Sequence, residues 1–158
     1  MSNLYDYLVN TVKRSKLQNP AVIFDIDGTL IRYDKTPIKP VVKFYHYCLK
    51  KGIPIFIVTA RPGTEYNKDY TIDELHKNNI QGWEGMYFYD NSFNNWGIAE
   101  SPLRYLTSTI YPGSIHRYKY EARKNIYENG FNAILSIGDQ EFDVGEYGGV
   151  SVLLHDKV

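Results

Sequence analysis

The sequence predicts an α/β fold, in which a parallel five-stranded sheet is doubly wound in the Rossmann-like manner and carries helices on both faces. Five short apolar runs, rich in β-branched and aromatic residues, predict strands at about 21–26, 53–58, 86–89, 133–137 and 150–154. Segments with the spacing of amphipathic helices occur at about 3–17, 39–51, 64–78 and 115–129. Because strands alternate with helices along the chain, the strands are expected to run parallel.

The first predicted helix, 3–17, carries apolar residues at near-helical spacing, namely Leu4, Leu8, Val12 and Leu17. The pair Asn19-Pro20 is expected to break it. The run that follows, Val22 to Ile26, is apolar without alternation, which is typical of a strand buried on both faces of a parallel sheet.

The second predicted helix, 39–51, has Pro40 in its first turn and ends at Gly52. Its expected apolar face consists of Val41, Phe44, Tyr45, Cys48 and Leu49. Cys48 is therefore expected to be a buried thiol. The second strand leads to Thr59, and the third helix, 64–78, is expected to turn Ile72 and Leu75 inward.

A long polar and aromatic segment, 91–113, separates the third strand from the fourth long helix. It is expected to lie near the active site and to hold a short helix near 101–108. Its aromatic residues, Trp96, Tyr105 and Tyr111, have the composition of a stacking surface. The alternative is that they pack the segment onto its own body. Ser114 is expected to cap helix 115–129, which Gly130 ends.

Length and composition favour a single domain, 1–158, in a cytoplasmic protein. The formal net charge of zero indicates no strong general attraction to nucleic acid or membrane. Cys48 is the single cysteine, so no internal disulfide can form. The first residues show no signal peptide, and no apolar run is long enough to span a bilayer.

The most informative residues are Asp25 and Asp27, which end the first apolar run. Residues at i and i+2 of an extended segment point the same way, so both carboxylates are expected at one site at the strand's carboxyl end. A charge there costs several kcal/mol unless it is paired or metal-bound. A shared proton or a bound divalent cation would each account for the pair. The alternative is an ordinary strand end followed by an Asp27-Gly28 turn.

Other polar residues are expected at the same sheet edge. Thr59 ends the second strand, Asp139 ends the fourth, and Asp143 lies just beyond. Helix 115–129 carries Lys119 and Arg123 one turn apart. Each has an ordinary interpretation as a turn residue or a solvated helix face. Their common location favours a ligand site, because ligands of such folds bind at the carboxyl ends of the strands.

Phosphoryl transfer is the chemistry that needs this set. A carboxylate nucleophile would form an acyl-phosphate, and Mg²⁺ would offset the repulsion between the carboxylates and the substrate. Thr59 and Lys119 would hold the phosphoryl oxygens. Asp27 would protonate the leaving alcohol and then activate water.

The motifs resemble those of the haloacid dehalogenase (HAD) superfamily. Asp25-Ile26-Asp27-Gly28-Thr29-Leu30 is similar to the first motif, Val58-Thr59-Ala60-Arg61 to the second, Lys119 to the third, and Gly138-Asp139-Gln140-Glu141-Phe142-Asp143 to the fourth. Its acid-phosphatase group, which includes plant vegetative storage proteins and bacterial class B acid phosphatases, is resembled by Tyr118 to Arg123, the Gly130 ending and Gly138-Asp139-Gln140. Thr71-Ile72-Asp73-Glu74-Leu75 followed by Gly82-Trp83 is also similar to the plant sequences.

The resemblance implies a Mg²⁺-dependent phosphatase with Asp25 as nucleophile and metal ligand. Asp27 would be the acid/base and a ligand through its backbone carbonyl, Asp139 a ligand, and Asp143 a supporting metal residue. The resemblance further implies that Thr59, Arg61 and Lys119 bind the substrate.

Several expectations concern partners and alternatives. The stretches between motifs are too short for a large cap domain, so an open site is expected, suited to a bulky substrate or to a subunit partner such as a second copy in a dimer.

The first expectation is a small phosphomonoester substrate. The alternatives are a nucleotide or a nucleic-acid end, which the neutral charge disfavours, and a non-catalytic storage or binding role. The acid-phosphatase group is mostly secreted or periplasmic, in contrast to the absence of a signal segment here.

Overall fold

The computed structural model describes residues 3–89 and 115–155. They form one five-stranded sheet in the order β3-β2-β1-β4-β5, and every pair of neighbouring strands is parallel. The expected α/β class is confirmed. The predicted segment 91–113, with its short helix near 101–108 and its aromatic residues, lies outside the described residues.

The elements follow the expected alternation. The strands are β1 (Pro20–Phe24), β2 (Ile55–Pro62), β3 (Gly85–Tyr89), β4 (Asn132–Gly138) and β5 (Val150–Leu153). The helices are α1 (Leu4–Arg14), α2 (Lys39–Lys50), α3 (Glu65–Lys77), α5 (Ile115–Glu128) and the short 3-10 helix η1 (Glu141–Asp143).

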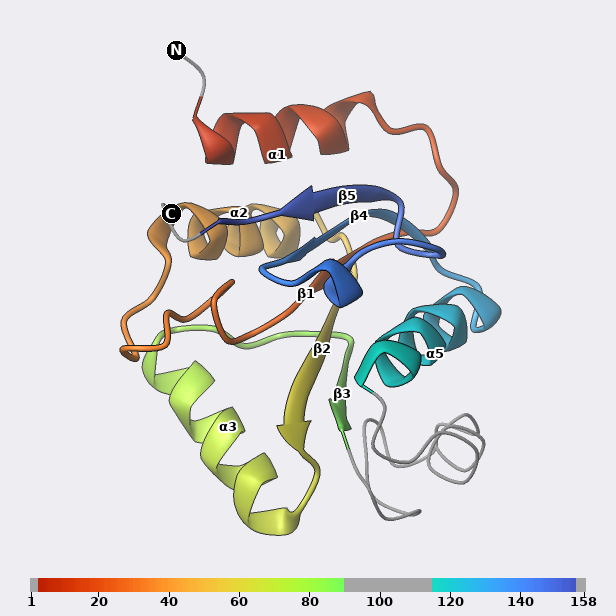
Figure 1. Cartoon of the computed structure of the whole chain (residues 1–158). Helices are drawn as coiled ribbons and strands as arrows, with labels where there is room; N and C mark the ends of the chain where they lie inside the picture. Colours follow the sequence, from red (N-terminus) through yellow and green to blue (C-terminus); the bar gives the residue numbers. More distant parts are fainter. Residues whose placement is uncertain (1–2, 90–114, 156–158) are drawn as a thin grey trace.

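Helices cover both faces of the sheet, as Figure 1 shows. α2 and α3 lie on one side and α5 on the other, while α1 packs against α2 and β4. The central strand β1 is almost entirely buried, which explains why its sequence is continuously apolar. The aromatic rings of Phe24, Phe44 and Tyr45 pack together between β1 and α2. The expected apolar face of α2 is confirmed for Val41, Phe44, Tyr45 and Cys48, which are fully buried, whereas Leu49 is only partly buried.

The first helix is shorter than expected. α1 ends at Arg14, because Ser15 takes an extended conformation and its N–H bonds to the carbonyl of Val12. The helix therefore stops before the Asn19-Pro20 pair reaches it, and Leu17, expected on its apolar face, is 48% exposed.

The second strand begins later and ends later than expected. β2 starts at Ile55, after Pro54, which has no N–H to donate to a neighbouring strand. It continues to Pro62, but its pairing with β3 shifts register between Val58 and Pro62. Residues 59–61 therefore leave the regular ladder, a distortion that re-aims side chains beside active sites in many sheets.

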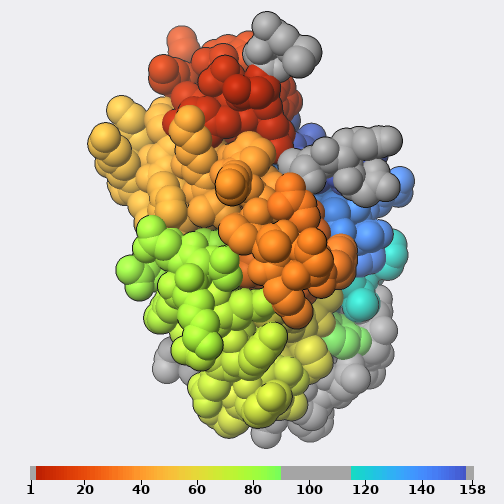
Figure 2. Space-filling view, turned by 90° about the vertical axis from the view of Figure 1, so that its left-hand side faces the viewer, coloured from red at the N-terminus to blue at the C-terminus, as the bar shows by residue number. Residues whose placement is uncertain are grey.

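The inward face of α3 also differs from the prediction. Leu75 is buried as expected, but the other buried residue is Thr71, while Ile72 is only partly buried. Figure 2 shows α1, α2 and α3 along one face, with the segment that follows β1 lying against α3. Lys35 of that segment lies 5.8 Å from the ring centre of Tyr70 on α3. Among the described residues, no helix is long and apolar enough to cross a membrane.

Candidate active site

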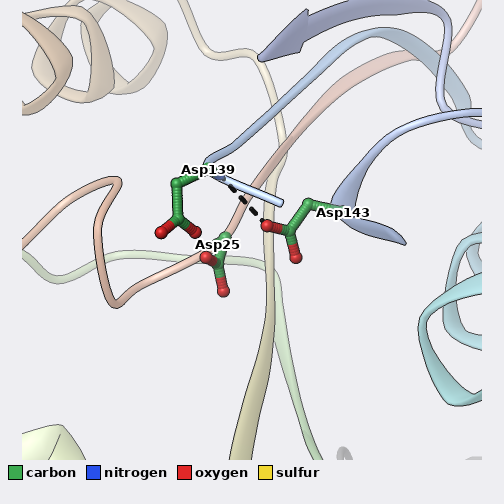
Figure 3. Close-up of side chains that lie close together, drawn as sticks. All are labelled: Asp25, Asp139 and Asp143. Atoms are coloured by element: carbon green, nitrogen blue, oxygen red, sulfur yellow. Dashed lines mark hydrogen bonds between the residues drawn. The ribbon is translucent and has the colours of Figure 1, made fainter. Parts of the chain in front are cut away.

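Three carboxylates meet at the carboxyl ends of β1 and β4. Asp25 follows β1 directly, Asp139 follows β4, and Asp143 lies in η1. One oxygen from each lies within 4.8 Å of the others, and Figure 3 shows the side chains pointing toward one another. The structure therefore brings these three aspartates together at one edge of the sheet, as the sequence predicted.

Asp143 owes its position to the turn after β4. Its Oδ2 accepts hydrogen bonds from the backbone N–H of Asp139 (3.1 Å) and of Gln140 (3.0 Å), and the first of these is the dashed line in Figure 3. A Cβ on Gly138 would overlap the side chain of Asp143, so glycine is required for this approach. The Gly138-Asp139 sequence thereby sets the spacing between the two carboxylates.

Asp139 is held by the segment after β1. The hydroxyl of Tyr33 donates a hydrogen bond of 2.9 Å to its Oδ2. A Cβ on Gly28 would overlap that same oxygen, and Gly28 has a φ of +79°, which favours glycine on conformational grounds as well. The Asp27-Gly28 turn therefore serves the site by letting Asp139 approach closely.

Lys119 of α5 is the cation of the cluster. Its buried Nζ lies 3.0 Å from Asp25 Oδ1 and 2.6 Å from Asp143 Oδ1, and it donates to the carbonyl of Val58 at 2.7 Å. Burial acts to lower the pKa of Lys119, but the charges of Asp25 and Asp143 outweigh that effect and raise it. The side chain is thus an ammonium aimed into the site.

Asp25 is almost completely buried beside Lys119. Burial raises the pKa of Asp25 to about 8, against the opposing effect of Lys119, and the negative charges of Asp143 and Asp139 add to the rise. Such a perturbed group at the bottom of a site is typical of functional residues. A cation bound beside Asp25 would favour its ionised form.

Asp27 lines the same cavity as Asp25, but its side chain is not part of the cluster of three carboxylates. Both line a cavity of about 240 Å³ together with Lys119 and Asp139, as the i, i+2 spacing predicted. The carboxylate of Asp27, however, forms a two-point ion pair with Arg61, with N–O distances of 2.9 and 2.8 Å. The group of three carboxylates with a geometry suited to a metal ion does not include its side chain.

The remaining predicted residues occupy distinct positions. Thr59 is fully buried, and its hydroxyl accepts a hydrogen bond of 3.1 Å from the N–H of Arg61. A hydroxyl that accepts one hydrogen bond can also donate one through its O–H. Its carbonyl accepts a hydrogen bond of 2.8 Å from Tyr118. Arg123 is also buried, but it donates to the carbonyls of Phe142 and Glu146 and thus braces the segment around η1.

Beside the cavity of about 240 Å³ lies a larger one of about 590 Å³, whose lining includes Gly28, Tyr33 and Asp139. Tyr33 and Asp139 line both cavities, whereas Gly28 lines only the larger one. Tyr33, 68% exposed, therefore stands at the boundary between the carboxylate cluster and the space outside it.

The carboxylate cluster fits a divalent metal. Asp25, Asp139 and Asp143 bring three carboxyl groups to one point, and Lys119 supplies one positive charge toward them. Asp139 Oδ1 is buried and has no hydrogen-bond partner among the described residues. Hard oxygen ligands in such an arrangement suit Mg²⁺ or a similar cation.

Comparison with protein-family models identifies the class. Residues 31–151 match the model described as HAD superfamily, subfamily IIIB (Acid phosphatase). The match covers most of the chain, and the chain belongs to this family of phosphoric monoester hydrolases, which confirms the expected resemblance. The matched range begins after Asp25 and Asp27, so their place in the site rests on the geometry above. A search of curated proteins found no match.

Four residues in the site have roles that the sequence did not indicate: Tyr33, Thr71, Glu74 and Tyr118. Thr71 and Glu74 contact Arg61, while Tyr33 and Tyr118 donate to Asp139 and to the carbonyl of Thr59. Each contact joins elements far apart in sequence, so no local spacing marks it. The only available signal was that Tyr118, Thr71 and Glu74 belong to segments resembling the acid-phosphatase group.

Proposed function

We propose that this phosphomonoester hydrolase is a Mg²⁺-dependent phosphatase that works through a phospho-aspartate on Asp25. The observation that carries the proposal is the position of the Asp25 carboxylate, which contacts the Lys119 ammonium and lies beside the carboxylates of Asp139 and Asp143 at one end of the sheet. The proposal treats residues 1–158 as one HAD-like hydrolase domain.

In the first step, a carboxylate oxygen of Asp25 attacks the phosphorus atom while the bond from phosphorus to the leaving oxygen breaks. Asp27, which lines the same cavity, gives a proton to the leaving oxygen and releases the alcohol. In the second step, Asp27 takes a proton from water, whose oxygen attacks the phosphorus of the acyl-phosphate. The bond from phosphorus to the Asp25 oxygen breaks as inorganic phosphate forms, which restores the Asp25 carboxylate and the Asp27 proton.

Lys119 and Thr59 are proposed to bind the transferring phosphoryl group. The Lys119 ammonium already contacts Asp25, so it lies beside the position at which phosphorus would be attacked. The Thr59 hydroxyl accepts from Arg61 and has its hydrogen available for a phosphoryl oxygen. Both groups are buried, where donors stabilise developing negative charge more strongly than in water.

Asp25, Asp139 and Asp143 would hold the metal, together with the backbone carbonyl of Asp27. When bound, the metal would offset the repulsion between the carboxylates and the substrate phosphate and stabilise charge on the phosphoryl oxygens. Tyr33 would fix the orientation of Asp139, since it already donates to Oδ2.

The test is phosphate release from p-nitrophenyl phosphate, with added Mg²⁺ and with EDTA, for the wild type and Asp25→Asn. We expect Mg²⁺-dependent turnover that the nearly isosteric variant loses while its circular dichroism is unchanged. Acid quenching during turnover should trap one phosphoryl group on the wild type, labile to hydroxylamine as acyl-phosphates are. Turnover retained by Asp25→Asn would overturn the assignment of the nucleophile.

A further inference from the structure

Arg61 is held from both sides by protein groups. Toward the cavity, its Nε and Nη2 donate to the two carboxylate oxygens of Asp27. Away from the cavity, its Nη1 donates to Thr71 Oγ1 at 3.1 Å and lies 2.7 Å from Glu74 Oε1. The side chain is only 12% exposed. Arg61, expected to bind substrate, therefore bridges α3 and Asp27.

The two outer contacts come from one face of one helix. Thr71 and Glu74 are three residues apart in α3, so their side chains are neighbours on its surface. Thr71 is fully buried and the Glu74 side chain is 10% exposed. The other cation near Glu74 is Lys35, which lies 3.9 Å away and is 59% exposed, so that contact is weak.

This arrangement fixes the direction of the Asp27 carboxylate. A guanidinium is planar and presents its N–H groups in a rigid fork, so a two-point pair sets the plane of the carboxylate that it binds. The orientation of Arg61 depends in turn on Nη1, which Thr71 and Glu74 hold. Burial acts to lower the pKa of Arg61, but the hydrogen bonds and charges of Asp27 and Glu74 outweigh it and raise the pKa.

We propose that Thr71 and Glu74 are positioning residues that hold Arg61 so that it aims Asp27 at the leaving-group oxygen. The inference rests on the proposed function, in which Asp27 is the general acid. It assigns a role to the segment Thr71 to Leu75, whose sequence resembles that of the acid-phosphatase group and whose function was open.

How much a misaimed Asp27 slows the reaction depends on the leaving group. An alkoxide needs a proton as it leaves, whereas p-nitrophenolate leaves well without one, so a misaimed acid slows alkyl phosphates more. In Glu74→Gln, we expect kcat/KM for glycerol 2-phosphate to fall by about ten-fold. The same constant for p-nitrophenyl phosphate should change less than about three-fold, because the positions of Asp25 and Lys119 are unaltered.

A second pair of variants separates positioning from folding. Thr71→Val keeps the shape of the side chain but removes the hydroxyl that accepts from Arg61, so it should shift the substrate ratio in the same direction. Thr71→Ser restores the hydroxyl and should restore the ratio. The matched control is Asp73→Asn on the same helix, whose carboxylate is 69% exposed and forms an ion pair of 3.5 Å with Lys77; its ratio should equal that of the wild type.

An equal fall with both substrates, or an unchanged ratio in both Glu74→Gln and Thr71→Val, would overturn the inference. An equal rise in KM for both substrates would instead place Arg61 on the phosphoryl group. Failure of the proposed function is a separate result, since it means that the wild type turns over neither substrate or that Asp25→Asn keeps its turnover. That result would overturn the inference with it.

Discussion

The ammonium of Lys119 lies 3.0 Å from Oδ1 of Asp25, and both side chains are almost completely buried. A single buried ion pair of this kind would carry almost no net charge. Here, however, Asp143 also contacts Lys119, and Asp139 lies beside Asp25. The cluster thus holds more carboxylates than cations, which makes the stability of the metal-free protein sensitive to the ionisation of Asp25.

The first prediction concerns that sensitivity. Burial raises the folded-state pKa of Asp25 to about 8, above the ordinary value of 3.8 that applies in the unfolded chain. The folded protein therefore binds this proton more tightly, and the stability that it contributes is fully present below about pH 4 and lost as pH rises toward about 8. In EDTA, urea unfolding should show the wild type losing stability relative to Asp25→Asn from pH 5 to pH 8.

The comparison with Asp25→Asn isolates one group, because the other titrating groups are common to both proteins. Mg²⁺ should stabilise the wild type more at pH 8 than at pH 5, since a proton on Asp25 competes with the metal. Two stability profiles that run parallel from pH 5 to pH 8 would contradict the prediction.

The second prediction separates two carboxylates of the cluster. Asp143→Ala removes an ion pair with buried Lys119 and two backbone hydrogen bonds, so it should lower the free energy of unfolding by about 3–5 kcal/mol in EDTA. Asp139→Ala removes the hydrogen bond from Tyr33 and should cost about 1 kcal/mol or less. Urea unfolding in EDTA measures both.

Both of these variants should lose the stabilisation that we expect Mg²⁺ to give the wild type, because each removes a carboxylate of the three-residue group. Equal stability losses for Asp139→Ala and Asp143→Ala would show that the turn after β4 does not depend on Asp143. Undiminished Mg²⁺ stabilisation in Asp139→Ala would remove Asp139 from the metal site.

The third prediction concerns the close approach of Gly28 to Asp139. Gly28→Ala places a Cβ where Asp139 Oδ2 lies, at a φ of +79°. We expect the strained backbone to cost about 1–2 kcal/mol and the displaced carboxylate to weaken Mg²⁺ binding and turnover by at least about ten-fold. Titration with Mg²⁺, followed by thermal unfolding and by activity, measures both effects.

Gly52→Ala is the matched control for this change. Gly52 has a similar φ of +72°, and a Cβ there would meet no atom within 4 Å. It should show the backbone cost without any loss of metal affinity. If Gly28→Ala and Gly52→Ala bind Mg²⁺ equally well, the contact between Gly28 and Asp139 has no part in the metal site.

The sequence was sufficient for the sheet, because apolar runs and helical spacing are local signals. It also placed Asp25, Asp139 and Lys119 at one edge, since strand ends converge in a parallel sheet. The early end of α1 was missed because Leu17 continued the apolar spacing, while a backbone bond from Ser15 to Val12 had already ended the helix. Periodicity alone does not report such a cap.

The partners of Arg61 could not be predicted for a different reason. Its motif indicated a substrate-binding role, whereas the structure pairs it with Asp27, Thr71 and Glu74. A guanidinium at a strand end can reach a ligand or a neighbouring helix, and the choice depends on how α3 packs against β2. That packing is set by contacts between distant residues, which no spacing in the sequence records.

The fourth prediction concerns the distorted end of β2. Tyr118 donates to the carbonyl of Thr59 and Lys119 to the carbonyl of Val58, so α5 holds two successive residues where β2 leaves its regular pairing with β3. Tyr118→Phe should cost about 1 kcal/mol of stability, and Thr59 should then be less well aimed, lowering kcat several-fold. Steady-state kinetics with p-nitrophenyl phosphate and urea unfolding give the two values. Tyr120→Phe is the matched control on the same helix, because the ring of Tyr120 packs near that of Tyr147, and it should leave kcat unchanged. A kcat for Tyr118→Phe equal to that of Tyr120→Phe would mean that β2 holds Thr59 in place without the hydroxyl of Tyr118.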